Sequence, residues 1–266
     1  GADRPGDNLF SETIIAVDVE SGQRVWHFQA VHHGLWDYDF PTHSNLVDVV
    51  VDGKPIKALV QVSKQAFVYA FDRETGEAIW PIEERAVPQE TNMPDEVPSP
   101  TQPFPTRPAP FDYQGVTVDD LVDFTPEIRE MALEVVKNYQ IGPLFTPPGR
   151  PIEGGTQGTL MRPPDFGAAG WAGAAVDPET GILYVPSRNI AVAIPLYAPD
   201  PDLGSTMRYT HGAPEQQRLQ QIRQGQSYNA QMPQGLPLLK PPYSRITAID
   251  MNTGDHVWMV PLGNGD

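Results

Sequence analysis

The sequence predicts an all-β fold, a β-propeller of four-stranded antiparallel blades with short helical insertions. Three features of the 266 residues support this prediction: a repeated hairpin pattern, strands with alternating apolar residues, and a high content of turn-forming residues. Gly occurs 23 times and Pro 30 times, which is typical of chains with many turns. Helical bundles use less of both residues, so the composition favours strands and loops.

The repeated pattern reads apolar-x-Asp-x-x-Ser/Thr-Gly-x-x-x-Trp, with Tyr184 replacing Trp in the third copy. Alternating apolar residues before the Asp predict a strand, the Asp caps a tight turn, and the Gly takes a positive φ. The next strand carries a Trp that can pack between neighbouring sheets. Such an array predicts about one blade per copy, although ordinary hairpins in a β-sandwich are the alternative. The four copies are AVDVESGQRVW (16–26), AFDRETGEAIW (70–80), AVDPETGILYV (175–185) and AIDMNTGDHVW (248–258).

The spacing of the copies predicts one partial propeller domain over residues 1–266, with surface insertions at about 81–145 and 195–240. The first two copies are separated by the length of one blade, whereas the later gaps are longer. The excess residues fall in the two insertions. Insertions at one end of a propeller usually build the rim of a substrate site.

The insertions contain one Pro-rich segment and two segments with helical character. Residues 81–115 are rich in Pro and are expected to form an ordered excursion over the surface. Residues 117–139 predict a helix, with Thr125 as the N-cap and Pro126 at the first helical position. A second helix is predicted at 214–224.

The charge and cysteine content exclude several classes of function. The formal charge of −16 argues against nucleic acid or an anionic membrane surface as a partner. The absence of Cys excludes zinc thiolate sites, disulfides and thiol nucleophiles. No apolar run is long enough to span a bilayer. The chain starts without an initiator Met or a signal peptide, so we expect a processed chain or an excised piece.

The stretch VHHGLWDYDFPTHS, residues 31–44, combines histidines, carboxylates and large aromatic residues. Asp37 and Asp39 alternate with aromatic neighbours, which fits either a solvated loop or a catalytic base beside a bound electron-accepting ring. His32 and His33 lack a third ligand at metal spacing, so they make a poor zinc site.

This stretch, together with RPGDNLF, LFTPP and the Trp repeat, resembles the PQQ-dependent (quinoprotein) dehydrogenases. The resemblance is to the C-terminal half of the glucose, sugar and polyol branch, and it identifies the repeat with that family's tryptophan-docking motif. It implies about half of an eight-bladed quinoprotein propeller. The implied activity is periplasmic oxidation of an alcohol or sugar by hydride transfer to pyrroloquinoline quinone (PQQ). Ca²⁺, Mg²⁺ or a lanthanide would accompany PQQ, and cytochrome c or ubiquinone would accept the electrons.

The same resemblance implies roles for individual residues. Asp37 corresponds to the proposed catalytic base, and Lys64, 27 positions later, corresponds to the basic residue that contacts the quinone oxygens. A carboxylate that takes the hydroxyl proton and a cation beside the quinone are the groups that this reaction needs. Trp171 is expected either near the cofactor or packed between blades, and Asn189 is a candidate quinone contact. Asp39, with Asp37, is a candidate metal ligand and is otherwise structural.

The sequence also departs from the family. A Glu and an Asn from earlier blades hold the metal in that family, and those blades are absent from these 266 residues. We therefore expect that the rest of the propeller lies in a longer chain or in a second chain. The alternative function is a non-catalytic quinoprotein-like propeller that acts as a binding or assembly scaffold.

Overall fold

The computed structural model describes residues 3–199, 206–211, 232 and 235–263. Within these ranges, no helix is both long enough and apolar enough to cross a membrane. Apart from a short 3₁₀ turn, η1 (Val118–Asp120), and one α-helix, α1 (Pro126–Val136), the regular structure described consists of strands. The strands are β1 (Thr13–Val17), β2 (Arg24–Gln29), β3 (Asn45–Val51), β4 (Lys54–Val62), β5 (Val68–Asp72), β6 (Ile82–Ala86), β7 (Thr101–Pro105), β8 (Thr159–Met161), β9 (Ala175–Asp177), β10 (Ile182–Arg188), β11 (Val192–Ile194), β12 (Leu196–Tyr197), β13 (Thr210–His211), β14 (Ser244–Asp250) and β15 (Asp255–Pro261).

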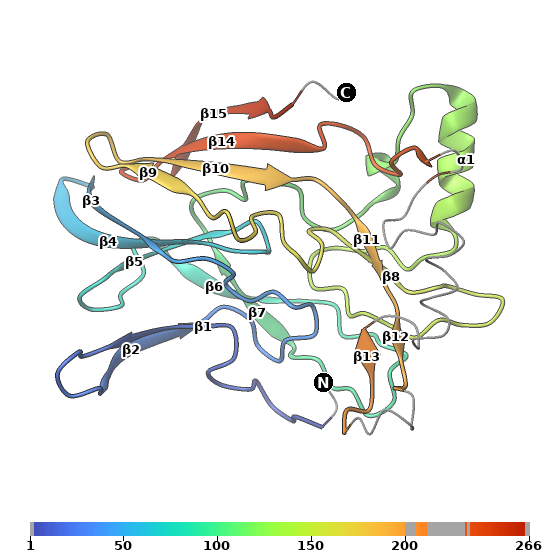
Figure 1. Cartoon of the computed structure of the whole chain (residues 1–266), viewed down its shortest axis with the longest axis horizontal. Coiled ribbons are helices and arrows are strands. Elements are labelled where there is room, and N and C mark those ends of the chain that lie inside the picture. The colour runs from blue at the N-terminus through green and yellow to red at the C-terminus, as the bar shows by residue number, and fades with distance from the viewer. Residues whose placement is uncertain (1–2, 200–205, 212–231, 233–234, 264–266) are drawn as a thin grey trace.

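Three antiparallel sheets form the framework and follow one another from bottom to top in Figure 1. They are the hairpin β1–β2, the sheet β3–β4–β5, and the four-stranded sheet β15–β14–β10–β9. This arrangement confirms the predicted all-β fold of antiparallel blades. Valine-rich β3 alternates buried and exposed positions, as expected for a strand with one face on the core, whereas β4 is buried at three successive positions at its end.

The expected correspondence of one blade to each repeat copy does not hold. The third copy forms the β9–β10 hairpin and the fourth forms β14–β15, yet β10 pairs with β14 along its whole length. Both copies therefore lie in one sheet. Tyr184, predicted to replace a docking Trp, instead contacts Trp258 within that sheet, with ring centroids 5.9 Å apart.

The indoles of the first two copies pack on the turns of later copies. Trp26 Nε1 donates to the carbonyl oxygen of Arg73 at 3.1 Å, and its ring lies against Gly76. A Cβ on Gly76 would lie 2.5 Å from Trp26 Cγ, so only Gly leaves room for the indole. Trp80 lies against Gly254 in the same way. These contacts connect the three sheets in order.

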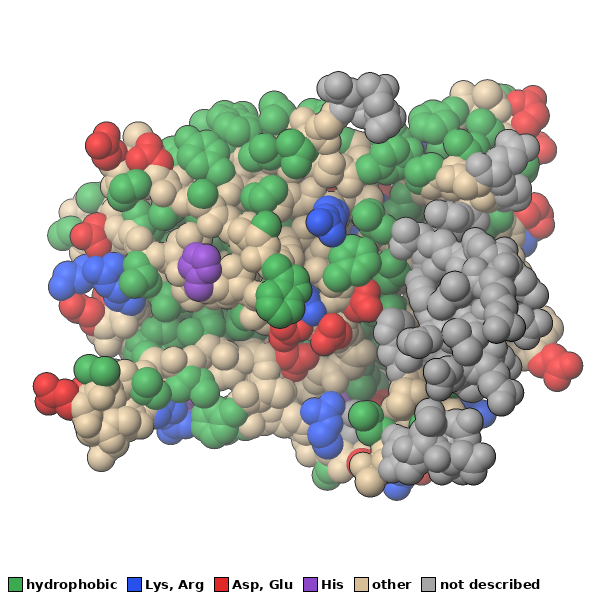
Figure 2. All heavy atoms as spheres, in the orientation of Figure 1, with side chains coloured by type: hydrophobic (Ala, Val, Ile, Leu, Met, Phe, Trp, Pro, Cys, Tyr) green, Lys and Arg blue, Asp and Glu red, His purple; other side chains and the backbone are tan. Residues whose placement is uncertain are grey.

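The last strand, β15, is an edge strand that exposes apolar side chains. Figure 2 shows hydrophobic side chains gathered along the upper edge of the molecule, over β14 and β15. An uncovered edge of this kind is a ready template for pairing with another strand. The exposed residues on and just after β15 are Val257, Trp258, Met259, Val260 and Leu262.

The first insertion is partly helical, as predicted. The Thr125 side chain accepts a hydrogen bond from the amide of Ile128 at 3.2 Å, and Pro126 begins α1. The predicted helix over 117–139 was too long, because its first part forms η1. The Pro-rich segment contains the hairpin β6–β7. The helix predicted at 214–224 lies outside the described residues.

Candidate functional site

Two buried aromatic side chains fix the loop that carries the candidate base. Trp36 is 2% exposed, and its Nε1 donates to the carbonyl oxygen of Thr146 at 2.8 Å. Tyr38 is 1% exposed, and its hydroxyl donates to the carbonyl oxygen of Pro163 at 2.6 Å. Phe145 meets both rings edge to face, at centroid distances of 5.2 and 6.0 Å. Burial and two hydrogen bonds therefore hold this loop in one position.

The carboxylates that alternate with these aromatics converge on one lysine. Lys64 Nζ donates to Asp37 Oδ2 at 3.0 Å, to the backbone oxygen of Asp37 at 2.7 Å, and to Asp39 Oδ1 at 2.5 Å. The Asp37 side chain is 73% exposed, whereas that of Lys64 is only 7% exposed. Asp37 also has a positive φ of 59°. The structure thus brings Asp37, Asp39 and Lys64 together and leaves the Asp37 carboxylate accessible.

Lys64 lies in the tight connection between β4 and β5. Burial alone would lower the pKa of its ammonium, but the hydrogen bonds to Asp39 and Asp37 outweigh burial and raise that pKa above its ordinary value. The site therefore holds a permanent, largely buried positive charge beside an accessible carboxylate.

A glycine-rich loop packs over Lys64 and presents Trp171. The amide of Ala168 donates to the carbonyl oxygen of Lys64 at 3.0 Å. Gly167, at φ +86°, lies so close that a Cβ there would be 2.6 Å from Lys64 Cγ. Trp171, four residues after Gly167, is 87% exposed. Among the described residues, no blade packs over the Trp171 indole, and both of its expected roles stay predictions.

Asn189 is buried in a backbone network behind this loop. It is 2% exposed, and its Nδ2 donates to the carbonyl oxygens of Lys240 at 3.3 Å and Pro242 at 3.0 Å. Its Oδ1 has no hydrogen-bond partner among the described residues. The preceding amide, of Arg188, donates to Ala168 at 3.0 Å. Backbone contacts thus link Asn189 to the Lys64 loop, but the structure does not bring its side chain into contact with Asp37.

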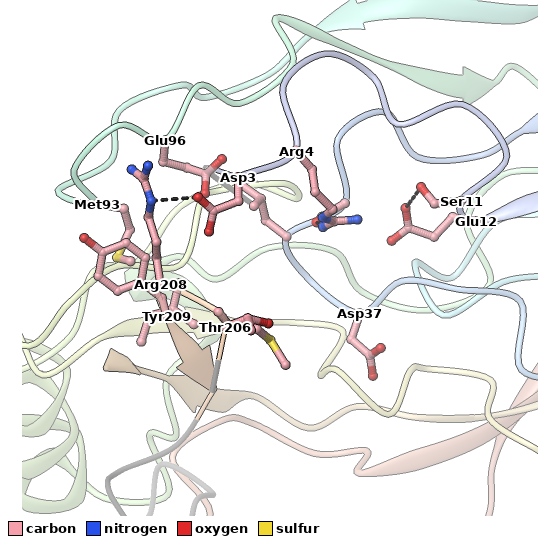
Figure 3. A pocket seen from close by; sticks show the side chains of 14 residues that line it. Asp3, Arg4, Ser11, Glu12, Asp37, Met93, Glu96, Thr206, Arg208 and Tyr209 are labelled. Carbon is pink, nitrogen blue, oxygen red and sulfur yellow. Dashed lines mark hydrogen bonds and ion pairs between the residues drawn. The ribbon is translucent and has the colours of Figure 1, made fainter. Parts of the chain in front are cut away.

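A cavity of about 760 Å³ opens beside Asp37. Figure 3 shows that segments distant in sequence meet around it, with the side chains of Arg4, Glu12 and Asp37 on one side. Glu96 and Arg208 lie on the other side. A volume of this size accommodates a small-molecule substrate. Arg4 begins the RPGDNLF stretch, but the sequence alone assigned no role to Arg4, Glu12 or Glu96. One sequence feature could have indicated that Glu12 lies near the site. Glu12 directly precedes β1, and the partner strand of β1 leads into the Asp37 loop.

Most charged groups of the cavity are already paired. His33 Nε2 contacts Glu96 Oε1 at 2.6 Å with both side chains buried, and His33 Nδ1 contacts the carbonyl oxygen of Gly6 at 2.7 Å. Asp3 Oδ1 binds Arg208 Nε at 2.7 Å. His33 is thus a structural partner of Glu96 in the cavity wall.

Glu12 is different, because its carboxylate has no ion-pair partner among the residues that the structure describes. The Ser11 hydroxyl donates to Glu12 Oε2 at 3.2 Å. Burial raises the pKa of the Glu12 carboxyl above its ordinary value, against the lowering effects of that hydrogen bond and of the nearby Arg4 charge.

No group of three or more His, Cys, Asp or Glu side chains in the described ranges is arranged to hold a metal ion. Asp37 and Asp39, the predicted metal ligands, both accept hydrogen bonds from the Lys64 ammonium. His32 contacts Glu84 at 2.9 Å and is likewise engaged elsewhere.

Replacing Tyr38 with Phe should loosen the loop of Asp37. The substitution keeps the ring but leaves the buried carbonyl of Pro163 without its hydrogen bond, so we expect the free energy of unfolding to fall by about 1–3 kcal/mol. Urea denaturation of the wild type and the variant measures this difference in unfolding free energy. Tyr113→Phe is the matched control, since Tyr113 is 44% exposed, and it should leave stability within about 0.5 kcal/mol. Equal stability of both variants would contradict the anchoring role.

Comparison with known proteins places the chain in a family. All of residues 1–266 match the family described as "PQQ: Glucose/ethanol/alcohol dehydrogenase, beta-propeller domain". The chain is 29% identical to the quinoprotein glucose dehydrogenase of Escherichia coli, with 97% of this chain and 32% of that protein covered. It is 28% identical to the glycerol dehydrogenase large subunit of Gluconobacter oxydans, with 97% and 36% covered.

Among solved structures, the quinohemoprotein alcohol dehydrogenase from Comamonas testosteroni has the same fold, with a TM-score of 0.52 and 19% identity. That match covers 96% of this chain and 30% of the other. The chain therefore spans about a third of the length of the relatives it matches. Since the family match extends over every residue, the chain belongs to the β-propeller family of PQQ-dependent glucose, ethanol and alcohol dehydrogenases.

Proposed function

We propose that this chain supplies the catalytic base and a cofactor-binding cation of a PQQ-dependent dehydrogenase that oxidises an alcohol, sugar or polyol. The observation that carries the proposal is the contact between an accessible carboxylate, Asp37, which lines the cavity, and the buried ammonium of Lys64. The names of its relatives support the general class of reaction.

In this proposal, Asp37 accepts the proton of the substrate hydroxyl. Asp37 lines the cavity with a side chain that is 73% exposed, and the loop anchored by Trp36 and Tyr38 holds it in place. Bound PQQ would supply the two-electron chemistry by accepting the hydride from the carbinol carbon. Lys64 holds the Asp37 carboxylate through a hydrogen bond to Oδ2, and it would offer positive charge to the quinone oxygens.

The donor set fits PQQ. The Lys64 ammonium, which now donates to Asp37 and Asp39, would give an anionic quinone a neighbouring cation, and the exposed indole of Trp171 offers a flat apolar surface on the loop tied to Lys64. The unpaired Oδ1 of Asn189 keeps that residue a candidate contact from the other side of the same loop. These three residues are the proposed cofactor contacts.

The described residues do not fit a metal ion in the same way. Ca²⁺, Mg²⁺ or a lanthanide bound by Asp37 and Asp39 would compete with Lys64 for both carboxylates. The proposed steps therefore do not pass through a metal. In this proposal, Asp39 positions the Lys64 ammonium.

We further propose that the chain is about half of the propeller of a periplasmic enzyme, its C-terminal part, and that more chain or another subunit completes the propeller. The uncovered apolar edge at β15 supports this, because a following sheet would cover it. Cytochrome c or ubiquinone would then take the electrons from the cofactor.

The test is reconstitution of the whole protein with PQQ. Dye reduction is followed with a panel of alcohols, sugars and polyols, with Ca²⁺, Mg²⁺ or La³⁺ added in separate samples. We expect dye reduction that requires both PQQ and a hydroxylated substrate. Protein that binds PQQ but reduces no dye with any substrate would favour the alternative of a non-catalytic scaffold.

A further inference from the structure

The carboxylate of Glu12 lies against the loop of the candidate base. Glu12 has a positive φ of 47° and directly precedes β1. A Cβ on Gly34 would lie only 2.1 Å from Glu12 Oε1, so the bare backbone at Gly34 makes room for this carboxylate. Gly34 is three residues before Asp37, and both carboxylates line the same cavity (Figure 3). The fold thus places Glu12 beside the reacting end of the site.

Glu12 also differs from the other acidic groups of the cavity in having no ion-pair partner among the described residues. Asp37 binds Lys64, Asp3 binds Arg208, and Glu96 binds His33. Within the part of the chain that the structure describes, Glu12 accepts one side-chain hydrogen bond, from the adjacent Ser11 hydroxyl. A carboxylate can accept several more hydrogen bonds. A ligand hydroxyl in the cavity can supply them.

Arg4 provides a donor next to this acceptor. It lines the same cavity, its guanidinium reaches the carbonyl oxygen of Gly34 at 3.4 Å, and its charge acts on Glu12. A carboxylate beside a guanidinium offers acceptors and donors together, as a pair of neighbouring hydroxyl groups requires. A monohydric alcohol would leave the partly buried Glu12 carboxylate without this partner, which lowers its binding relative to a polyol.

We propose that Glu12, supported by Arg4, is a specificity-determining residue that binds a second hydroxyl group of the substrate and so selects polyols over monohydric alcohols. This inference rests on the proposed function and narrows its substrate class. Asp37 takes the proton of the reacting hydroxyl, and Glu12 holds a neighbouring one.

The test compares glycerol with 1-propanol, which has the same number of carbons. In the PQQ-reconstituted whole protein, Glu12→Gln should lower the ratio of kcat/KM for glycerol to kcat/KM for 1-propanol by about 10-fold or more. Gly34→Ala should act in the same direction, because the new methyl group displaces the carboxylate without altering it. Gly34 does not have a positive φ, so Ala tolerates its backbone. Glu20→Gln, at an exposed turn of the same hairpin, is the control and should leave the ratio unchanged.

A second readout separates this inference from the proposed function. Glycerol and 1-propanol are titrated into PQQ-free protein, and binding is measured by saturation-transfer NMR without turnover. Weaker glycerol binding in Glu12→Gln supports the inference even if no dye is reduced. An unchanged selectivity ratio, an equal loss for both alcohols, or no glycerol binding by the wild-type protein would overturn it. Absence of dye reduction with every substrate would instead reject the proposed function.

Discussion

Replacing Asp37 with Asn is expected to lower kcat of the PQQ-loaded whole protein by about 10²- to 10⁴-fold. The amide has nearly the same shape as the carboxylate but cannot accept the proton of the substrate hydroxyl. The fold should survive, because the Asp37 side chain is 73% exposed and its backbone oxygen still accepts a hydrogen bond from Lys64. Steady-state dye reduction measures kcat, and thermal unfolding checks that the variant is folded.

Asp39→Asn is the matched control for this experiment. It removes one negative charge from the same lysine, at 2.5 Å, but leaves the proposed base intact. We expect kcat to fall by less than about 10-fold, since general-base catalysis is retained. Activity of Asp37→Asn equal to the wild type would remove the base assignment. A loss in Asp39→Asn as large as in Asp37→Asn would show that the ion pair, and not the base, controls the rate.

Local features of the fold were well predicted from the sequence. The Asp–Gly turns, the strands before them and the Thr125 cap all depend on neighbours close in sequence, so pattern and propensity suffice. The assignment of copies to sheets failed because pairing of β10 with β14 joins residues far apart in the chain. A hairpin pattern carries no information on which sheet the hairpin enters.

The candidate site was predicted only in part. Resemblance supplied Asp37 and Lys64, and the structure places them in contact. The roles of Trp36 and Tyr38 as buried anchors depend on carbonyl oxygens more than a hundred residues away, which no local pattern reveals. Glu12 belongs to the site through a cavity wall assembled from separate segments, so it could be recognised only in three dimensions.

Removing the charge of Lys64 should also cause a large loss of activity. Lys64→Met keeps most of the apolar stem, which packs against Gly167, and deletes the ammonium that faces both carboxylates. We expect kcat/KM to fall by about 10²- to 10³-fold, as for loss of a preorganised donor to developing negative charge. PQQ affinity, followed by quenching of protein fluorescence, should fall as well. Lys57→Met is the control, because Lys57 is an exposed lysine paired with Glu74 at 2.7 Å and should leave both quantities unchanged.

The pH dependence of stability provides an independent check on Lys64. Hydrogen bonds to Asp39 and Asp37 raise its pKa above the ordinary value of 10.5, so folding favours the protonated amine. The resulting stabilisation is fully present below that ordinary value and is lost as the pH rises through the raised pKa. The difference in unfolding free energy between wild type and Lys64→Met should therefore be constant near neutral pH and shrink above about pH 10.5. A difference that stays constant through that alkaline range would mean that the ammonium contributes nothing to the folded state, and the charge assigned to the cofactor site would then be unsupported.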